Sequence, residues 1–192
     1  KEDKKPIDVK IENKYYKIYY NIVDNKKKAN SDNLVAMLYW IDDTDFKLLK
    51  NRYRDEKIII CVAQVDNYDE VKSNTDEVNR PIVLAEIDKS INAFATSING
   101  LVRKYENDKY IIIFENEHLK KLEAKRFNIL DKIREIDLGN KIPITLSMGI
   151  GINGKDPNET YEYAKAAIDI ALGRGGDQAV LKENNRLSFY GG

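Results

Sequence analysis

Residues 103 to 114 read RKYENDKYIIIF, and this stretch has the form of a β-hairpin. Polar turn formers, with Asn107 and Asp108 at or near the tip, precede a dense β-branched run. Such a pattern favours a tight turn that leads into a buried strand. A carboxylate on a rigid hairpin is well placed to hold a metal, yet Asn-Asp is also what a tight turn selects for backbone reasons. The hairpin therefore raises the question of whether its tip is a functional site.

The composition excludes several classes of partner and site. The 32 basic and 32 acidic side chains cancel, so no strong field gathers nucleic acid or an anionic membrane, and we expect neither partner. His118 is the single histidine, which excludes intact sites built from several histidines. Cys61 is the single cysteine and is typical of a reducing compartment. Without an apolar run of the ~20 residues that span a bilayer, or a signal peptide, the chain is predicted to be cytoplasmic.

The first 56 residues predict a small sheet followed by a helix. Residues 7–23 alternate in polarity with a turn near Glu12, and residues 33–41 form a further strand. Two or three antiparallel strands are not a stable domain alone, so we interpret residues 1–42 as the end of a larger domain. Residues 43–56 predict a connecting helix, with N-cap candidates and apolar residues at Asp43, Thr44, Phe46, Leu48, Leu49 and Tyr53.

From Lys57 onward the pattern is that of a complete α+β domain. The run KIIICVAQV predicts a strand buried on both faces, because no charge occurs before Asp66. The order of elements contains a ferredoxin-like β-α-β-β-α-β core with additions, which predicts an antiparallel sheet with helices mostly on one face. After this strand we predict helices at 66–72, 81–102, 118–136 and 158–175, and strands in the hairpin and at 142–152, 178–184 and 186–191.

Two of these helices carry apolar residues at helical spacing. The core stripe predicted for 81–102 is Ile82, Leu84, Ala85, Ile87, Ile91, Phe94, Ala95 and Ile98. The stripe predicted for 118–136 is Leu119, Leu122, Phe127, Leu130, Ile133 and Ile136.

Three features together resemble the GGDEF family. They are a buried strand that ends in the acidic turn VAQVDNYDEV, the hairpin ENDKY, and ITLSMGIGI before an alanine-rich helix that ends in GRGGDQAV. GGDEF domains have a nucleotidyl-cyclase-like fold, and active members join two GTP molecules into cyclic di-GMP. The resemblance covers Lys57 to about Lys182. It implies an antiparallel sheet flanked by helices, in agreement with the pattern above.

Most of the family's catalytic positions differ in this chain. Gln64 stands where active members carry a metal-binding aspartate, while Asp66 matches the second aspartate of that strand. The signature hairpin falls on residues 106–110, where Asp108 keeps the metal-ligand position and Lys109 replaces a glutamate. A neutral amide does not supply the charge that two Mg²⁺ ions need.

The family's other ligand contacts are also replaced. The asparagine that reads guanine in active members would fall near Lys72 in this chain, and residues 97–100 (SING) lack the Arg-x-x-Asp product site. Leu172 replaces a phosphate-binding lysine. Each lost contact typically costs a few kcal/mol of transition-state stabilisation. We therefore expect no diguanylate cyclase activity and no catalytic residue for it.

A narrower resemblance rests on four features together: the first strands with YWIDDTDF, the strand VAQVDNYDEV, the stretch ALGRGGDQAV and the terminal FYGG. The chain is similar to membrane-anchored cyclic-di-AMP phosphodiesterases of the GdpP/YybT type, in which a PAS sensor and a degenerate GGDEF domain precede a DHH/DHHA1 catalytic unit. It implies C-terminal PAS strands at 1–42, a connector helix at 43–56 and the degenerate GGDEF domain at 57–192. It also implies the cytoplasmic portion of a plasma-membrane homodimer, with manganese in a DHH domain outside this chain. Heme would require the complete PAS domain.

The resemblance implies a regulatory segment that binds adenine nucleotide. Asp66 and Asp108 would hold Mg²⁺ with ATP, and Lys109 and Arg174 would contact phosphate. Two other functions stay open: a slow Mg²⁺-dependent ATPase, or a dimerisation spacer without ligand. Structural roles also stay open, in which Asp66 caps the next helix, Asp108 shapes its turn, Lys109 is merely solvated, and the glycines after Leu172 form a helix C-cap.

Overall fold

The apolar run Ile58–Val65 forms β4, a central strand of a six-stranded sheet with the order β5-β6-β4-β7-β8-β9. It pairs antiparallel with β6 (Lys109–Glu115) and with β7 (Leu146–Gly151). The side chains of Ile59, Cys61, Ala63 and Val65 enter one core, and those of Ile60 and Val62 enter the other. The prediction of a strand buried on both faces is confirmed.

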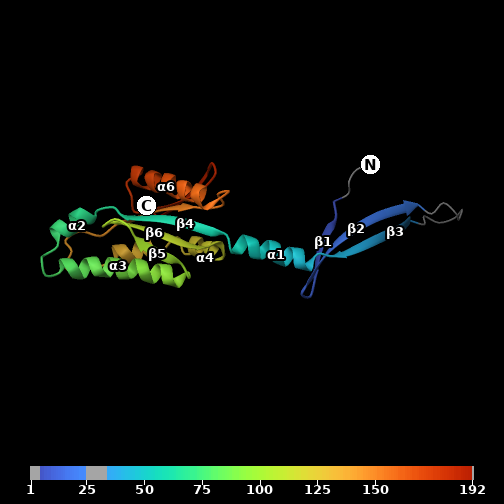
Figure 1. Cartoon of the computed structure of the whole chain (residues 1–192), viewed down its shortest axis with the longest axis horizontal. Helices are drawn as coiled ribbons and strands as arrows, with labels where there is room; N and C mark the ends of the chain where they lie inside the picture. Colours follow the sequence, from blue (N-terminus) through green and yellow to red (C-terminus); the bar gives the residue numbers. More distant parts are fainter. Residues whose placement is uncertain (1–4, 25–33, 192) are drawn as a thin grey trace. The chain divides into compact units, whose positions relative to one another are not determined.

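The computed structural model describes residues 5–24 and 34–191. The chain divides into two compact units, the N-terminal unit Lys1–Arg54 and the C-terminal unit Asp55–Gly192 (Figure 1). Parts of the predicted segment 1–42, including Asn33 at the start of its last strand, lie outside the described residues.

The N-terminal unit is a three-stranded antiparallel sheet followed by a helix. Its strands are β1 (Ile7–Ile11), β2 (Lys14–Asp24) and β3 (Leu34–Asp42), in that order in the sheet. Helix α1 (Thr44–Asp55) is joined to the sheet because the Tyr15 amide donates to Thr44 Oγ1 at 2.9 Å. The strands and the helix agree with the predicted elements. Their assignment to a PAS domain stays a prediction.

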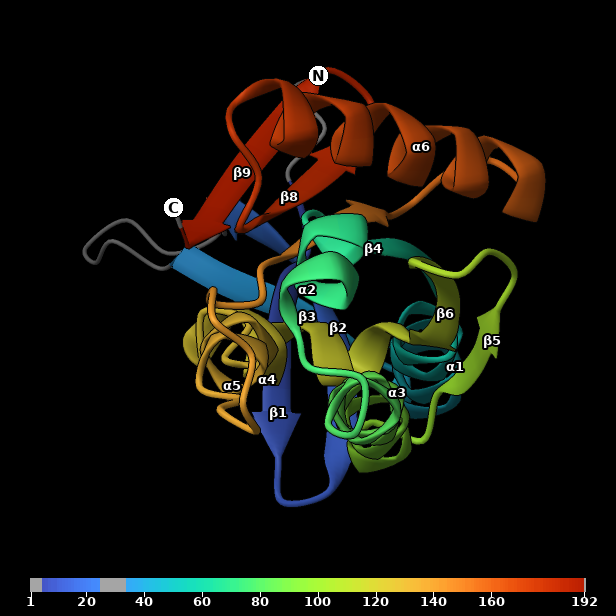
Figure 2. The same ribbon diagram turned by 90° about the vertical axis from the view of Figure 1, so that its left-hand side faces the viewer.

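In the C-terminal unit, helices cover both faces of the sheet (Figure 2). Helices α2 (Tyr68–Asn74), α3 (Arg80–Ser97), α4 (Leu119–Ala124) and α5 (Ile129–Arg134) pack on one face. Helix α6 (Pro157–Gly173) packs on the other. The remaining elements are the short edge strand β5 (Leu101–Lys104), the 3-10 turn η1 (Asn116–His118) and the hairpin of β8 (Gln178–Glu183) and β9 (Arg186–Gly191).

The fold class is as predicted, but four details of the elements were wrong. The sheet is not wholly antiparallel, because β7 and β8 run parallel. Helix α3 ends at Ser97, five residues before the predicted end, since Asn99 adopts a left-handed φ of 49° and the chain turns into β5. Its core stripe is shifted: Val83 is buried, whereas Ile82 and Ala85 are exposed.

The fourth difference is a break in the helix predicted over 118–136. Arg126 and Phe127 have φ values of 49° and 51°, so the helix is divided into α4 and α5. The break places the Phe127 ring fully inside the core, 5.1 Å from the ring of Tyr190 on β9. All six residues predicted for this core stripe are buried, because the break keeps both short helices against the sheet.

Helix α6 lies directly on β7, which requires glycine in that strand. A Cβ atom on Gly151 would meet the Thr160 carbonyl oxygen at 1.9 Å, and one on Gly149 would meet the Ile168 nitrogen at 2.2 Å. On the helix side, the contact is made by small residues that are fully buried: Ala164, Ala167 and Ala171. Helix α6 can therefore approach β7 this closely because the glycines of the strand have no side chains and the facing residues of the helix have small ones.

We expect Gly151→Ala to destabilise the C-terminal unit by about 3 kcal/mol, because the clash is with helix backbone that cannot rotate away. The melting temperature should fall by roughly 6–12 °C in calorimetry. Gly173→Ala is the matched control, since a Cβ atom there meets nothing within 4 Å. Equal melting temperatures for the two variants would contradict this account of the packing.

Candidate functional site

The hairpin tip meets the end of β4 through one side-chain hydrogen bond. Gln64 Nε2 donates to Asp108 Oδ2 at 3.0 Å, and the Val65 amide donates to the Asp108 carbonyl at 2.9 Å. The residue that stands for the family's first metal-binding aspartate is therefore joined directly to the one acidic residue kept in the signature hairpin. The side-chain amide of Gln64 donates a hydrogen bond to Asp108. An aspartate in the place of Gln64 would repel the Asp108 carboxylate unless a cation lay between the two.

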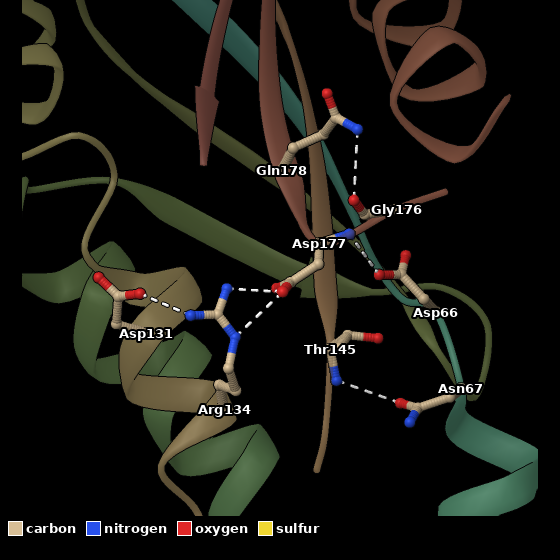
Figure 3. Close-up of polar contacts among 8 residues, drawn as sticks. All are labelled: Asp66, Asn67, Asp131, Arg134, Thr145, Gly176, Asp177 and Gln178. Atoms are coloured by element: carbon tan, nitrogen blue, oxygen red, sulfur yellow. Dashed lines mark hydrogen bonds and ion pairs between the residues drawn. The ribbon is translucent and has the colours of Figure 1, made fainter. Parts of the chain in front are cut away.

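Asp66 continues from β4 on the same side of the strand as Gln64, but it has a different partner. Its Oδ2 accepts a hydrogen bond from the Asp177 amide at 2.9 Å, at the start of β8 (Figure 3). Gly176 lies against it so closely that a Cβ atom there would be 2.7 Å from Asp66 Oδ2. Asp66 therefore fastens the end of β4 to the turn before β8. The alternative that Asp66 caps α2 is wrong, since the N-cap residue is Asn67.

Asn67 and Asp66 also hold the segment that leads into β7. The Asp66 amide donates to the Thr145 carbonyl at 2.9 Å. The Thr145 amide donates to Asn67 Oδ1 at 3.1 Å (Figure 3). Asn67 Nδ2 donates to the Pro143 carbonyl at 2.8 Å. These three bonds fix the end of β4 to the backbone of the segment that leads into β7.

The turn before β8 is tied to α5 by an ion pair. Arg134 donates to Asp177 Oδ2 from Nη2 at 2.6 Å and from Nε at 3.0 Å, and its Nη1 donates to Asp131 Oδ1 at 2.9 Å (Figure 3). Asp177 raises the pKa of Arg134 through these bonds. Within the described residues, Asp66 Oδ1 and Asp177 Oδ1 are buried without a hydrogen-bond partner. These two oxygens are acceptors that water or a cation can use.

The glycine-rich turn after α6 is a helix cap. The Gly176 amide donates to the Ala171 carbonyl and the Gly175 amide to the Leu172 carbonyl, both at 3.0 Å, with φ values of 77° and 105°. This is the Schellman arrangement, in which the amides are used within the turn. Gln178 completes it with bonds from Nε2 to the carbonyls of Ala171 and Gly176 at 3.3 Å. The C-cap prediction for these glycines is confirmed.

The predicted phosphate contacts have protein partners of their own. Lys109 Nζ lies 2.7 Å from Glu106 Oε2, and this bond raises the pKa of Lys109. Arg174 lies over the Phe189 ring, 4.6 Å from its centre, and donates from Nε to Gln178 Oε1 at 3.2 Å. Lys109 is thus at the hairpin, whereas Arg174 contacts β8 and β9. In the part of the chain that the structure describes, no hydrogen bond or ion pair joins any two of the four predicted residues, Asp66, Asp108, Lys109 and Arg174.

A shallow hollow of about 340 Å³ opens beside the hairpin tip. Three of its lining residues, Asp69, Glu106 and Asp108, are acidic. Such a wall repels a free phosphate and attracts a cation. The other lining residues are Tyr68 and Asn107. No group of three acidic, histidine or cysteine side chains suited to a metal ion occurs among the residues that the structure describes.

Tyr110 anchors the hairpin to helix α3. Its ring is almost fully buried and its hydroxyl donates to Asp88 Oδ1 on α3. Burial, and then the Asp88 carboxylate, raise the pKa of the Tyr110 hydroxyl. Lys104 Nζ pairs with Asp88 at 2.9 Å and lies over the rings of Tyr68 and Tyr110. The lysine therefore neutralises this carboxylate and is not a free cation for a ligand.

Comparison with known proteins places the C-terminal unit in one family. Residues 63–189 match the model of the cyclic-di-AMP phosphodiesterase GdpP-like GGDEF domain. The chain belongs to this family. It is 34% identical over 157 residues to the cyclic-di-AMP phosphodiesterase PdeA of Listeria monocytogenes and 32% identical to GdpP of Geobacillus thermodenitrificans. Each alignment covers 81% of this chain and 24% of the relative, so the chain spans about a quarter of these proteins.

The fold is also that of active cyclases. The structure of the active GGEEF domain of a diguanylate cyclase from Vibrio cholerae matches with a TM-score of 0.57 and 17% identity, over 73% of this chain and 90% of that chain. This likeness confirms the predicted GGDEF fold. Across residues 5–24 and 34–191, every helix is too short or too polar to cross a bilayer.

Several residues of the site escaped prediction from the sequence. Arg134 is 43 positions from Asp177, and nothing in the helical pattern around it indicates that partner. Gln64 was identified as a lost metal ligand, but its bond to Asp108 depends on the register of β4 against β6. The sequence did give a signal for the turn that holds Asp177, because the Gly-Gly-Asp-Gln run after α6 carries the glycines that a helix C-cap favours.

We expect Asp66→Ala to release the turn before β8, because the Asp177 amide loses its acceptor. The cost should be about 1–2 kcal/mol, and the Asp177 amide should lose protection in hydrogen exchange measured by NMR. Glu77→Ala is the control, as an exposed acidic residue away from this contact. Unchanged protection of the Asp177 amide would contradict the assigned role of Asp66.

Proposed function

We propose that this GGDEF-type domain is a regulatory segment of a cyclic-di-AMP phosphodiesterase and does not make cyclic di-GMP. The observation that carries the proposal is the hydrogen bond from Gln64 to Asp108. Two carboxylates at this contact would repel each other unless metal ions lay between them. The amide removes that repulsion without a metal, so this strand end is stable without the ions that GTP condensation requires.

Adenine nucleotide would bind at the hairpin only together with Mg²⁺. The hollow is acidic and Lys109 is paired with Glu106, so bare phosphates are disfavoured. Asp108, which lines the hollow, would hold a single Mg²⁺ together with nucleotide phosphates, since proteins commonly hold Mg²⁺ through one or two carboxylates plus phosphates. Asp66 does not line the hollow and bonds to the β8 turn instead, so it would not be a ligand of this ion in the arrangement observed. A pair of ions does not fit, because Gln64 is neutral. Arg174 would contact a phosphate only by leaving Phe189 and Gln178.

Regulation would act through coupling between the hairpin and the rest of the protein. The end of β4 bonds to the hairpin tip through Gln64 and to the β8 turn through Asp66. A nucleotide that changes either contact would shift the conformations of both the hairpin tip and the β8 turn. The domain would then regulate through a coupling free energy between sites, without catalysing a reaction. The remaining parts of the proposal are a PAS sensor before α1, a manganese-dependent DHH unit, membrane anchoring and a homodimer.

A titration of the 192-residue chain with ATP, GTP and cyclic di-AMP, with and without Mg²⁺, tests the nucleotide part of the proposal. We expect Mg²⁺-dependent ATP binding that Asp108→Ala removes, without release of cyclic di-GMP. Hydrolysis of ATP that Asp108→Ala abolishes would favour a slow ATPase. Absence of binding by every nucleotide would favour a spacer, and synthesis of cyclic di-GMP from GTP would overturn the proposal.

Gln64→Asp should convert this contact into one that depends on metal. Without Mg²⁺ the variant loses a hydrogen bond and gains a like-charge contact, so we expect a loss of about 1–2 kcal/mol. Added Mg²⁺ should restore the melting temperature of this variant and leave that of the original chain nearly unchanged. Gln64→Ala is the control, because it loses the bond without adding a carboxylate. A Mg²⁺ response equal in both variants would contradict the role of Gln64.

A further inference from the structure

A groove of about 320 Å³ lies between α3 and the pair α4–α5, on the face of the sheet opposite α6. It is separate from the hollow at the hairpin tip, and the two share no lining residue. Its volume lies within the ~300–1,000 Å³ typical of small-molecule sites. We call it the lysine groove, and its lining is mainly lysine, small polar and apolar side chains.

Four lysines from three helices surround the lysine groove. They are Lys89 of α3, Lys121 of α4, Lys132 of α5, and Lys125 at the end of α4. Lys89 is paired with Glu86, the one acidic residue of the lining. Within the described residues, the other three lysines form no ion pair. The lining of the groove therefore carries more positive than negative charge, although the chain as a whole is neutral.

Two acidic side chains close to the groove are engaged elsewhere, whereas Glu135 and Asp137 line an adjoining hollow that shares Lys132 with the groove. Glu123, on α4, accepts a hydrogen bond from the Tyr190 hydroxyl at 2.8 Å. Asp131, on α5, accepts from Arg134 at 2.9 Å. These contacts hold the two carboxylates outside the groove lining, and the lysines are left to an anion from outside.

The floor of the groove suits a ligand with an apolar part. Phe94 and Leu122 are buried residues of the lining, and Ser90, Ser97 and Asn128 add hydroxyl and amide groups to it. Such a combination of an apolar floor, a few polar groups and a cationic rim matches a base and sugar that carry phosphates. A bare polyphosphate would use the rim alone.

We propose that the lysine groove is a second nucleotide site, which binds a nucleoside polyphosphate through Lys121, Lys125 and Lys132 without a metal ion. It goes beyond the hairpin site, which needs Mg²⁺ because its walls are acidic. Recognition there would not be that of a GGDEF product site, because Ser97 and Ile98 line the groove and residues 97–100 contain neither arginine nor aspartate.

The experiment is calorimetric titration of the 192-residue chain with ATP and with inorganic tripolyphosphate, in EDTA. We expect ATP to bind in EDTA, and Lys121→Gln with Lys125→Gln to weaken that binding by about tenfold or more. Lys120→Gln with Lys155→Gln is the matched control, since it removes the same charge from lysines outside the groove lining, and binding should change by less than about twofold. Tighter binding of ATP than of tripolyphosphate would support a nucleotide; equal binding would overturn that part and leave an inorganic polyphosphate site.

Asp108→Ala separates this proposal from that for the hairpin. It should leave binding in EDTA intact while removing the Mg²⁺-dependent binding. Absence of ATP binding in EDTA, or equal losses in the groove variant and its control, would overturn the second site without touching the hairpin proposal. Chemical shift changes on ATP addition in EDTA should cluster on α3, α4 and α5; a cluster at the hairpin tip would also overturn the proposal.

Discussion

Burial of β4 on both faces is the constraint on which the rest of the C-terminal unit depends. A strand with apolar side chains in two cores needs helices on both sides of the sheet. On one side a single helix, α6, does this, and it reaches the sheet only because β7 carries Gly149 and Gly151 beneath it. The polar end of β4 is therefore held between two packed layers, and its side chains have few directions open to them.

The polar end of β4 is held by hydrogen bonds at the positions where the family resemblance led us to expect metal ligands. Gln64 and Asp66 lie on the same side of the strand, yet one bonds to the hairpin tip and the other to the β8 turn. In a site built for two Mg²⁺ ions, the ligands would stay apart until the ions neutralised them. Here an amide and a backbone N–H supply the neutralising donors, and the contacts are made within the protein. On the proposed function, glutamine in place of one carboxylate would be enough to change the kind of site.

Local sequence signals correctly predicted the elements whose residue types strongly favour a single local conformation. The β-branched run of β4, the Asn-Asp hairpin and the glycine cap after α6 all formed where the pattern indicated. The phase of α3 was wrong because Ile82 and Val83 are both apolar, and only packing against the sheet decides which is buried. The sequence gives no sign of the break at Arg126 and Phe127, because neither residue is glycine or proline. The break forms because burial of the Phe127 ring overrides helix propensity.

Site residues were harder to predict than elements, because their partners are set by tertiary register. Asp66 was placed at the correct strand end, but whether it would face Asp108 or the β8 turn depends on how α6 positions Gly176. The distribution of charge over the domain also depends on tertiary structure, because the charged residues that line each hollow come from separate segments of the chain. Acidic side chains gather at the hairpin hollow and lysines gather in the groove between α3 and α4, although the totals cancel over the chain. A neutral sequence can thus form two surfaces of opposite charge. On our two proposals, one surface would select its ligand through a cation that the ligand carries, and the other through the ligand's own negative charge.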